Sequence, residues 1–173
     1  MRSWLAIALL LACASLVGAQ IPSDWERENA ERLKQSGEHT VAPPRLDRSR
    51  LVELKLEREA GFRYFLDAAS VSVGADRIVR YTLVARSPSG VENISFEGLR
   101  CPGEYRIYAV GRPDGGWGGR PSAWRAVPPD ERVGQRALSK RYFCPGRAAI
   151  QTAEEGVRAL RAGGHPGVFL DQD

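Results

Sequence analysis

Two cysteines constrain the fold of this chain more than any other feature of its sequence. Cys101 and Cys144 each begin a Cys-Pro-Gly tripeptide, while the third cysteine, Cys13, lies near the N-terminus. A redox-active pair usually has Cys-x-x-Cys spacing, and a structural metal site needs about four ligands. The two histidines, His39 and His165, stand far from each other. We therefore expect a disulfide worth roughly 4 kcal/mol of stability, with free thiols as the alternative.

The first 19 residues are typical of a signal peptide for export. Arg2 supplies a positive start, an apolar run extends from Leu5 to Leu16, and small residues precede a cleavage site after Ala19. The run is shorter than the roughly 20 apolar residues that a membrane span needs. Export would place the remaining cysteines in the oxidising periplasm, where a disulfide persists.

The same segment contains a second motif. The letters LLAC, residues 10–13, resemble a bacterial lipoprotein signal, in which Cys13 is acylated and becomes the new N-terminus. The protein would then be an outer-membrane lipoprotein. The residues after Cys13 stay apolar where a tether would be polar, which favours cleavage after Ala19.

Composition indicates a folded domain that follows a charged N-terminal segment. Hydrophobic residues make up 43% and charged residues 27% of the chain, which argues against general disorder. The net charge of +4 is too small to indicate a nucleic-acid partner. Residues 20–49 form a charged arm, in which Ser23 and Glu26 predict a helix ending near Leu33. Apolar residues are few in this arm, so the sequence leaves open whether the arm docks.

Residues 50–164 are expected to form a single α+β domain. Apolar and polar residues alternate in several segments, which predicts an antiparallel sheet of about four to six strands. A C-terminal helix begins at the capping box of Thr152 and Glu155 and stops at Gly163. A flexible tail, 165–173, follows. The strands are predicted at 51–57, 62–66, 77–86, 91–99 and 104–111, with 67–75 as a connection or a short strand.

The register of the central hairpin decides which side chains share a face. A two- or four-residue loop within Ser87–Gly90 pairs Tyr81 with Phe96 and Arg80 with Glu97. One face is then apolar and the other mostly polar, as an antiparallel sheet with one buried side requires. This register predicts that Glu97 holds Arg80 on the polar face.

The next strand extends both faces. A tight turn at Pro102-Gly103 pairs Phe96 with Ala109 and Glu97 with Tyr108. We interpret the polar side chains as a recognition patch for an anionic or peptide-like ligand, or as a solvated face whose exposed ion pairs are each worth under about 1 kcal/mol. In a third arrangement, the C-terminal helix covers and buries this face. The patch consists of Arg80, Glu97, Arg106 and Tyr108.

A glycine-rich segment, residues 113–124, carries two tryptophans. It lacks the Gly-Lys-Ser/Thr ending of a phosphate-cradling loop, so a nucleotide site is not indicated. Trp117, Trp124 and Tyr142 are candidates for a surface that stacks on a sugar or a peptide. The simpler interpretation is that these rings close one end of the β core.

The order of the motifs resembles a known family. SVGADRIVRYTLVARSPSGVENISFEGLRC is followed by EYRIYAVGRPDGGW, a further tryptophan and YFCPG. Over residues 50–147 this order resembles the CNP-one-like family of small exported bacterial proteins. Arg77 replaces the glycine expected after the aspartate. The resemblance implies an envelope location and a shared domain, and it supplies no activity, cofactor or catalytic residue.

We expect a periplasmic binding or interaction module without catalysis, cofactor or metal. Its partner would be an envelope protein, peptide or glycan. A structural envelope lipoprotein, touching the membrane only through Cys13, is one alternative. A small periplasmic hydrolase, in which Asp67, Asp76 and Glu97 converge, is another, although no Gly-x-Ser-x-Gly or His-Glu-x-x-His motif supports an enzyme. The candidate ligand contacts are Arg80, Glu97, Arg106, Tyr108, Trp117 and Trp124.

Overall fold

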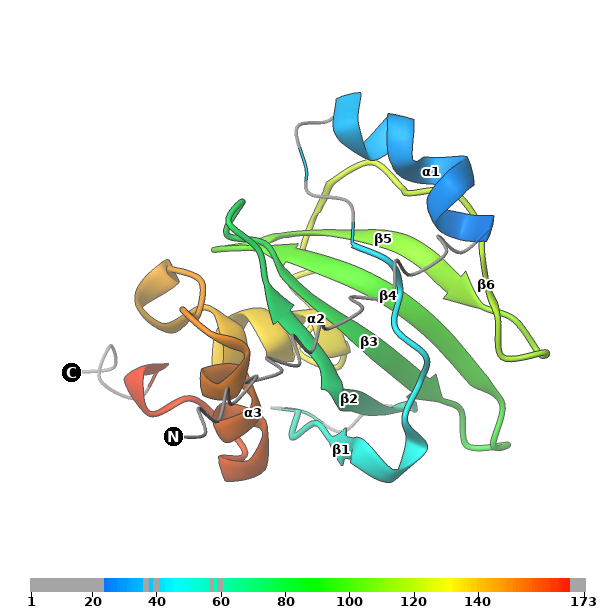
Figure 1. Ribbon diagram of the computed structural model, residues 1–173. Coiled ribbons are helices and arrows are strands. Elements are labelled where there is room, and N and C mark those ends of the chain that lie inside the picture. The colour runs from blue at the N-terminus through cyan, green and yellow to red at the C-terminus, as the bar shows by residue number, and fades with distance from the viewer. Residues whose placement is uncertain (1–23, 36–37, 39–40, 57, 59–60, 169–173) are drawn as a thin grey trace, which may run out of the picture.

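An antiparallel sheet with helices on both faces forms the centre of the protein (Figure 1). The α+β class predicted from the sequence is therefore confirmed. The expected signal peptide and the candidate lipidation site Cys13 lie outside the described residues. The structure is a computed structural model that describes residues 24–35, 38, 41–56, 58 and 61–168.

The sheet has seven strands, all antiparallel to their neighbours, in the order β1-β2-β3-β4-β5-β6, and β7 also pairs with β5. The segment whose form the sequence left open continues β2 as far as Val73, with an irregularity between Asp67 and Ser72. The strands are β1 (Leu51–Glu53), β2 (Arg63–Val73), β3 (Val79–Arg86), β4 (Glu92–Arg100), β5 (Glu104–Gly111), β6 (Trp117–Gly118) and β7 (Arg125–Ala126).

Helices cover the sheet from opposite sides. The arm contributes α1 (Asp24–Gln35), as the arm's capping box predicts, and this helix lies on one side (Figure 1). The other side is covered by α2 (Gly134–Ala137), the π-helix η2 (Leu138–Phe143) and α3 (Ala153–Ala162). Two 3-10 turns, η1 (Arg48–Arg50) and η3 (Pro145–Arg147), complete the elements. We call the two sides the arm face and the helix face.

The predicted ends of the C-terminal helix are confirmed. The Thr152 hydroxyl accepts a hydrogen bond from the Glu155 amide at 3.2 Å, which caps the first turn of α3. Gly163 ends the helix in the left-handed conformation, with φ at 75°. The packed chain extends past the expected boundary at residue 164, because the His165 Nε2 atom lies 2.9 Å from Glu155 Oε1.

The predicted register between β3 and β4 is wrong by one residue. Tyr81 lies opposite Glu97, and Arg80 lies opposite Gly98. The Ser87 amide donates to the Val91 carbonyl, so the loop has three residues instead of the two or four expected. Because side chains alternate between faces, this single residue moves Glu97 to the face opposite Arg80.

The register between β4 and β5 is right at one end and wrong at the other. Phe96 lies opposite Ala109 as predicted, but a bulge then shifts the pairing, so that Glu97 lies opposite Ile107 and Gly98 opposite Arg106. The bulge keeps Tyr108 on the arm face, where its ring lies over Gly98. A β-carbon at residue 98 would come within 2.6 Å of that ring, so glycine is required there.

The main apolar core fills the helix face. Tyr81, Leu83 and Leu99 of the central strands are almost completely buried and contact the helical segments opposite. The ring of Tyr81 lies 5.7 Å from that of Phe143. Tyr142 is also fully buried, and its hydroxyl accepts a hydrogen bond from the Lys55 amide at 2.8 Å. The core therefore fixes the π-helix η2 against the sheet.

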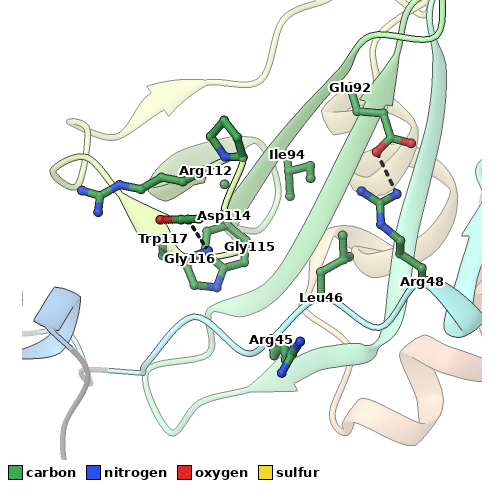
Figure 2. Close-up of a pocket in the computed structure, with 12 residues that line it drawn as sticks. Arg45, Leu46, Arg48, Glu92, Ile94, Arg112, Asp114, Gly115, Gly116 and Trp117 are labelled. Atoms are coloured by element: carbon green, nitrogen blue, oxygen red, sulfur yellow. Dashed lines mark hydrogen bonds and ion pairs between the residues drawn. The ribbon is translucent and has the colours of Figure 1, made fainter.

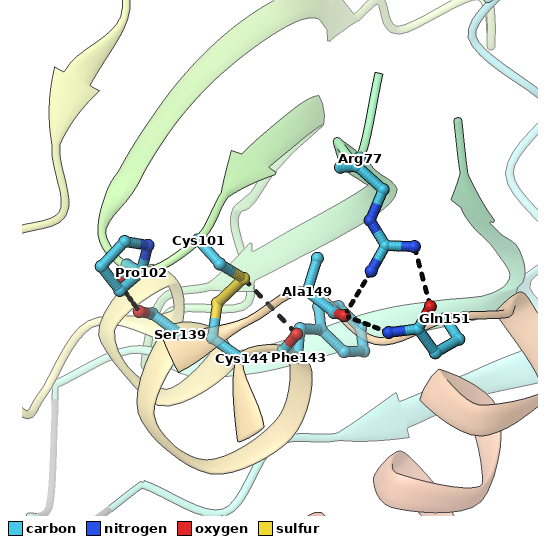
Figure 3. The surroundings of a disulfide bond; sticks show 8 residues. All are labelled: Arg77, Cys101, Pro102, Ser139, Phe143, Cys144, Ala149 and Gln151. Atoms are coloured by element: carbon cyan, nitrogen blue, oxygen red, sulfur yellow. Dashed lines mark hydrogen bonds between the residues drawn. A yellow bond between two sulfur atoms is a disulfide. The ribbon is translucent and has the colours of Figure 1, made fainter. Parts of the chain in front are cut away.

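The predicted disulfide is confirmed. Cys101, directly after β4, is bonded to Cys144, directly after η2 (Figure 3). The Ser139 hydroxyl donates to the Pro102 carbonyl beside it at 2.6 Å. Both contacts attach the β4–β5 turn to the π-helix, so the disulfide secures the helix face of the molecule.

Arg77 occupies a backbone conformation that favours glycine. Its φ is 60°, which explains why a glycine is expected at this position. The side chain is anchored, since it donates to Gln151 Oε1 at 2.9 Å and to the Ala149 carbonyl at 3.0 Å (Figure 3). These bonds join the turn before β3 to the segment that leads into α3.

The arm docks on the sheet, which the sequence left open. Trp25 of α1 is buried in a small second core with Phe96 and Tyr108. Farther along, the Pro44 carbonyl accepts a hydrogen bond from the Trp117 indole at 3.0 Å, and the Asp47 amide donates to Asp67 at 2.8 Å. The arm thus contacts the arm face at several separate points along its length.

Candidate functional site

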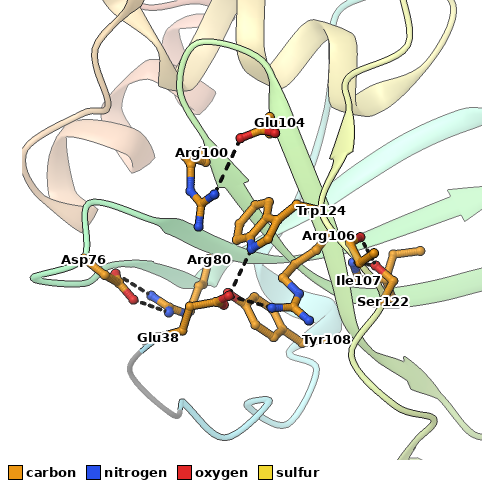
Figure 4. A network of polar contacts seen from close by, with 11 residues as sticks. Glu38, Asp76, Arg80, Arg100, Glu104, Arg106, Ile107, Tyr108, Ser122 and Trp124 are labelled. Carbon is orange, nitrogen blue, oxygen red and sulfur yellow. Dashed lines mark hydrogen bonds and ion pairs between the residues drawn. The ribbon is translucent and has the colours of Figure 1, made fainter. Parts of the chain in front are cut away.

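A carboxylate from the arm is held by side chains of the sheet. Glu38 is 7% exposed and accepts three hydrogen bonds, from Arg106 Nη1 at 2.6 Å, the Tyr108 hydroxyl at 2.6 Å and Trp124 Nε1 at 3.0 Å (Figure 4). We call Arg106, Tyr108 and Trp124 the carboxylate clamp. The clamp brings together three of the residues that the sequence analysis singled out. The acid that they surround, Glu38, was not among those candidates.

Strand pairing positions the clamp. Arg106 and Tyr108 alternate along β5, so both project from the arm face. Trp124 directly precedes β7, which pairs with β5. The segment before it is fastened to β5 through Ser122, whose amide donates to the Ile107 carbonyl at 2.8 Å and whose hydroxyl accepts from the Ile107 amide at 3.0 Å. Strand β5 and the segment fastened to it therefore hold all three donors.

A second ion pair lies beside the clamp. Arg80 is 1% exposed and donates to both carboxylate oxygens of Asp76, at 3.1 and 2.6 Å. The guanidinium carbons of Arg80 and Arg106 lie 5.4 and 5.3 Å from the Tyr108 ring centroid. Each of the two cations thus makes a favourable contact with the ring, and each is paired with its own acid. Asp76, not Glu97, is the acid that holds Arg80.

The clamp favours a charged carboxylate. Burial alone would raise the pKa of Glu38, but hydrogen bonds from Tyr108 and Trp124 and the charge of Arg106 outweigh it. The pKa of Glu38 therefore lies below its usual value. One donor is left over, because the buried Arg106 Nε atom has no hydrogen-bond partner among the described residues.

Glu97 lies on the helix face and takes no part in the clamp. Its carboxylate is 1% exposed and accepts hydrogen bonds from Ser95 Oγ at 2.6 Å, Gln135 Nε2 at 3.0 Å and the Tyr81 hydroxyl at 3.2 Å. These donors are all neutral. Burial raises the pKa of Glu97 to about 7, although the three hydrogen bonds oppose the shift. The patch predicted from Arg80 and Glu97 together is therefore wrong.

An open cleft lies farther along the arm face. Its volume is about 650 Å³, and it runs between the arm near Leu46 and the loop that joins β5 to β6 (Figure 2). Leu46, Ile94 and Trp117 supply apolar surface, and arginines stand around it. The lining arginines are Arg45, Arg48 and Arg112.

The three aromatic residues proposed to form one stacking surface are separated. Trp117 lines the cleft, Trp124 belongs to the clamp, and Tyr142 is buried on the helix face. Trp124 is itself covered by Arg100, whose guanidinium carbon lies 4.1 Å from the indole ring centroid. Of the three, only Trp117 faces an open cleft.

The carboxylates considered for a hydrolase do not share a site. Asp67 lies opposite Thr82 on the arm face and accepts the Asp47 amide. Asp76 binds Arg80, and the sheet separates both from Glu97. No group of three or more histidine, cysteine, aspartate or glutamate side chains suited to a metal ion occurs within residues 24–35, 38, 41–56, 58 and 61–168.

Sequence reasoning missed the two contributions that the arm makes. Glu38 stands alone between polar residues, and no local pattern marks it as buried. In the sequence, Arg45 and Arg48 likewise look like ordinary members of the charged arm. The sequence did contain one indication, because the charges predicted for this side of the sheet do not balance. A buried Arg106 requires an acidic partner, which must then come from elsewhere in the chain.

Comparison with known proteins supports a family assignment. The model of the CNP1-like family matches residues 31–161, a range that begins within the arm and ends within α3. The match includes Glu38, the clamp and the disulfide. Neither the search of curated proteins nor the search of solved structures returns a match. Within the part of the chain that the structure describes, we find no helix with the length and apolar character needed to span a bilayer.

Proposed function

The chain belongs to the CNP1-like family, and on this premise we propose that it is an exported, non-catalytic binding module. Its ligand is an acidic peptide segment of an envelope protein, which binds in the open cleft beside Trp117. The observation that carries this proposal is the combination of apolar side chains and arginines in the lining of one accessible cleft. Small numbers of well-placed polar groups around an apolar surface are typical of ligand sites.

The charges around the cleft support an acidic ligand. Glu92 is engaged by Arg48 and Arg86, each at 2.8 Å. The Asp114 carboxylate accepts the Gly116 amide at 2.8 Å. Among the described residues, neither Arg45 nor Arg112 forms an ion pair, and both are exposed at the cleft. The three arginines that line the cleft outnumber its two acids, Glu92 and Asp114, so the lining carries a net positive charge.

Trp117 suits the apolar part of such a ligand. Its indole nitrogen is already bonded to Pro44, so the ring is fixed while one surface lines the cleft. A fixed aromatic ring loses little conformational entropy on binding, and such rings often contribute most of the affinity at interfaces. An extended peptide that alternates acidic and apolar residues matches both features.

Export to the periplasm is part of the proposal. The signal-like N-terminus supports it, and so does the disulfide, because such bonds persist mainly in oxidising compartments. An anchored lipoprotein is the second candidate and rests on the LLAC motif. Mass spectrometry of the protein isolated from the bacterial envelope separates the two: a chain that begins at Gln20 without added mass supports the soluble form, and an acylated Cys13 supports the anchor.

Tryptophan fluorescence of the exported protein tests the cleft. The probes are two acetylated octapeptides, one alternating glutamate with leucine and the other lysine with leucine. We expect a saturable change only with the acidic peptide, weakened by salt and absent from Trp117→Phe. An Arg45→Gln, Arg112→Gln double variant should bind about tenfold more weakly, since each exposed charge contributes a fraction of the energy.

Three results would overturn the assignment. The first is equal binding of the acidic and basic peptides. The second is unchanged affinity in the double arginine variant. The third is a response of Trp117 to a neutral oligosaccharide in the absence of any response to the acidic peptide, which would make the ligand a glycan.

A further inference from the structure

We propose that the carboxylate clamp is a second binding site, which accepts a carboxylate presented by another polypeptide, and that Glu38 fills it as a tethered ligand. This site is distinct from the cleft and does not depend on it. Its donors lie on β5 and directly before β7, while the acceptor that they share, Glu38, comes from the arm (Figure 4). The sheet thus provides the hydrogen-bond donors of the binding site, and the arm provides the carboxylate that is bound there.

Charge balance explains why the clamp needs an anion. Arg80 is neutralised by Asp76, and Arg106 is neutralised by Glu38. With the arm in place the side chain of Arg106 is only 10% exposed, so a clamp without the Glu38 carboxylate would hold a buried cation without an acid. An uncompensated buried charge is strongly unfavourable. Departure of Glu38 therefore creates a strong preference for another carboxylate in the same place.

Glu38 does not use the full capacity of Arg106. It accepts from Nη1, while the buried Nε has no partner among the described residues. Arginine binds carboxylates best through two parallel hydrogen bonds. A ligand that adds a second acceptor for Nε, beside a carboxylate held at Nη1, would satisfy the donor that Glu38 leaves unpaired and would form one more hydrogen bond than the tethered side chain.

The tether gives Glu38 an advantage that a competitor must overcome. A side chain joined to the site by a short segment has an effective concentration in the millimolar range. A free carboxylate such as acetate should therefore fail against the intact arm and bind once Glu38 is removed. A peptide that adds contacts around its carboxylate is the kind of ligand that competes.

Nuclear magnetic resonance of the Trp124 indole N–H tests this site in the full exported chain. The variants are Glu38→Ala, which empties the clamp, and Glu38→Gln, which keeps the side-chain volume without the charge. The probes are sodium acetate, with chloride as the matched salt, and a peptide copying residues 36–43 with either glutamate or glutamine at its third position. We expect a saturable shift of the Trp124 signal in Glu38→Ala with acetate and with the glutamate peptide, and a smaller acetate shift in Glu38→Gln.

The controls separate this site from the cleft. Adding Arg106→Gln to Glu38→Ala should weaken acetate binding about tenfold, because the charge-assisted hydrogen bond is lost. The Arg45→Gln, Arg112→Gln variant, which tests the cleft, should leave the Trp124 response intact when combined with Glu38→Ala. The inference would be overturned if the Trp124 indole signal shifted with neither acetate nor peptide in both Glu38 variants. It would also be overturned if Glu38→Ala responded to acetate equally with and without Arg106→Gln.

Discussion

A glutamate is buried on each face of the sheet, and its surroundings shift its pKa in opposite directions on the two faces. Glu38 on the arm face meets an arginine, and its pKa lies below the usual value. Glu97 on the helix face meets only neutral donors, and burial raises its pKa to about 7. The difference teaches that burial determines the pKa of Glu97, whereas at Glu38 the hydrogen bonds from Tyr108 and Trp124 together with the charge of Arg106 outweigh burial.

The same contrast separates structural from recognition roles. The helix face combines a large apolar core with a disulfide, so it stabilises the fold. The arm face carries the buried ion pairs and the open cleft. The binding that we propose therefore lies on the arm face, and Glu97 belongs to a core in which burial favours its protonated form.

The largest effect is expected from the disulfide of the helix face. Replacing both Cys101 and Cys144 by serine should lower the free energy of unfolding by roughly 4 kcal/mol, because the cross-link no longer restricts the unfolded chain. Urea unfolding of the variant and of the reduced wild type measures this loss, and the two should agree. A loss under about 1 kcal/mol would show that the core holds the helix face without the bond.

The next effect is the pH dependence that Glu97 imposes. The unfolded chain releases this proton near pH 4.5, whereas the folded chain keeps it to about pH 7. Stability from this group is therefore complete below pH 4.5 and is lost as the pH rises through 7, by about 3 kcal/mol in all. In Glu97→Gln the loss should be absent when urea unfolding is followed from pH 4.5 to 8. An unchanged pH profile in this variant would contradict a neutral Glu97 in the core.

The pH dependence of stability that Glu38 imposes should have the opposite sign to that of Glu97. The lowered pKa of Glu38 contributes stability above the unfolded value of 4.5, and this contribution disappears as the pH falls through the folded pKa. Glu38→Gln should therefore be about 2 kcal/mol less stable than the wild type at pH 7, since hydrogen bonds to a charged group are lost. The two proteins should converge in acid. A stability difference that persists in strong acid would mean that shape, and not charge, makes the contact favourable.

The smallest effect is expected at Arg77, which belongs to the helix face. Both Arg77→Ala and Arg77→Gly lose the hydrogen bonds to Gln151 and Ala149, but only alanine retains the strain of a positive φ. Arg77→Gly should be the more stable of the two by about 1 kcal/mol in urea unfolding. Neither change should alter the Trp124 indole signal, because the clamp lies on the other face. An Arg77→Ala variant as stable as Arg77→Gly would argue against backbone strain at this turn.

The fold could be predicted in outline because its signals are local. Alternating residues placed the main strands, and the capping box at Thr152 placed α3. The two-cysteine pattern placed the disulfide. The register failed at one loop, because the hydrogen bond between Ser87 and Val91 closes a three-residue loop that no turn motif reveals. One residue was enough to exchange the faces of β4.

The candidate site was predicted only in part, because it depends on contacts between distant segments. Arg106 and Tyr108 were correctly grouped, since they alternate on one strand. Their partner Glu38 lies some seventy positions earlier, with separations of 68 and 70. Sequence spacing carries no information on such a contact, and only the tertiary fold brings the acid to its donors.

The most direct test of the contrast between the two faces is a carboxyl titration by carbon-13 nuclear magnetic resonance of glutamate-labelled protein. The account predicts that Glu97 titrates near pH 7 and that Glu38 titrates below the ordinary glutamate value of 4.5 in the same sample. Two carboxyl groups that both titrate near 4.5 would contradict it, because neither the burial of Glu97 nor the clamp around Glu38 would then have the effect described.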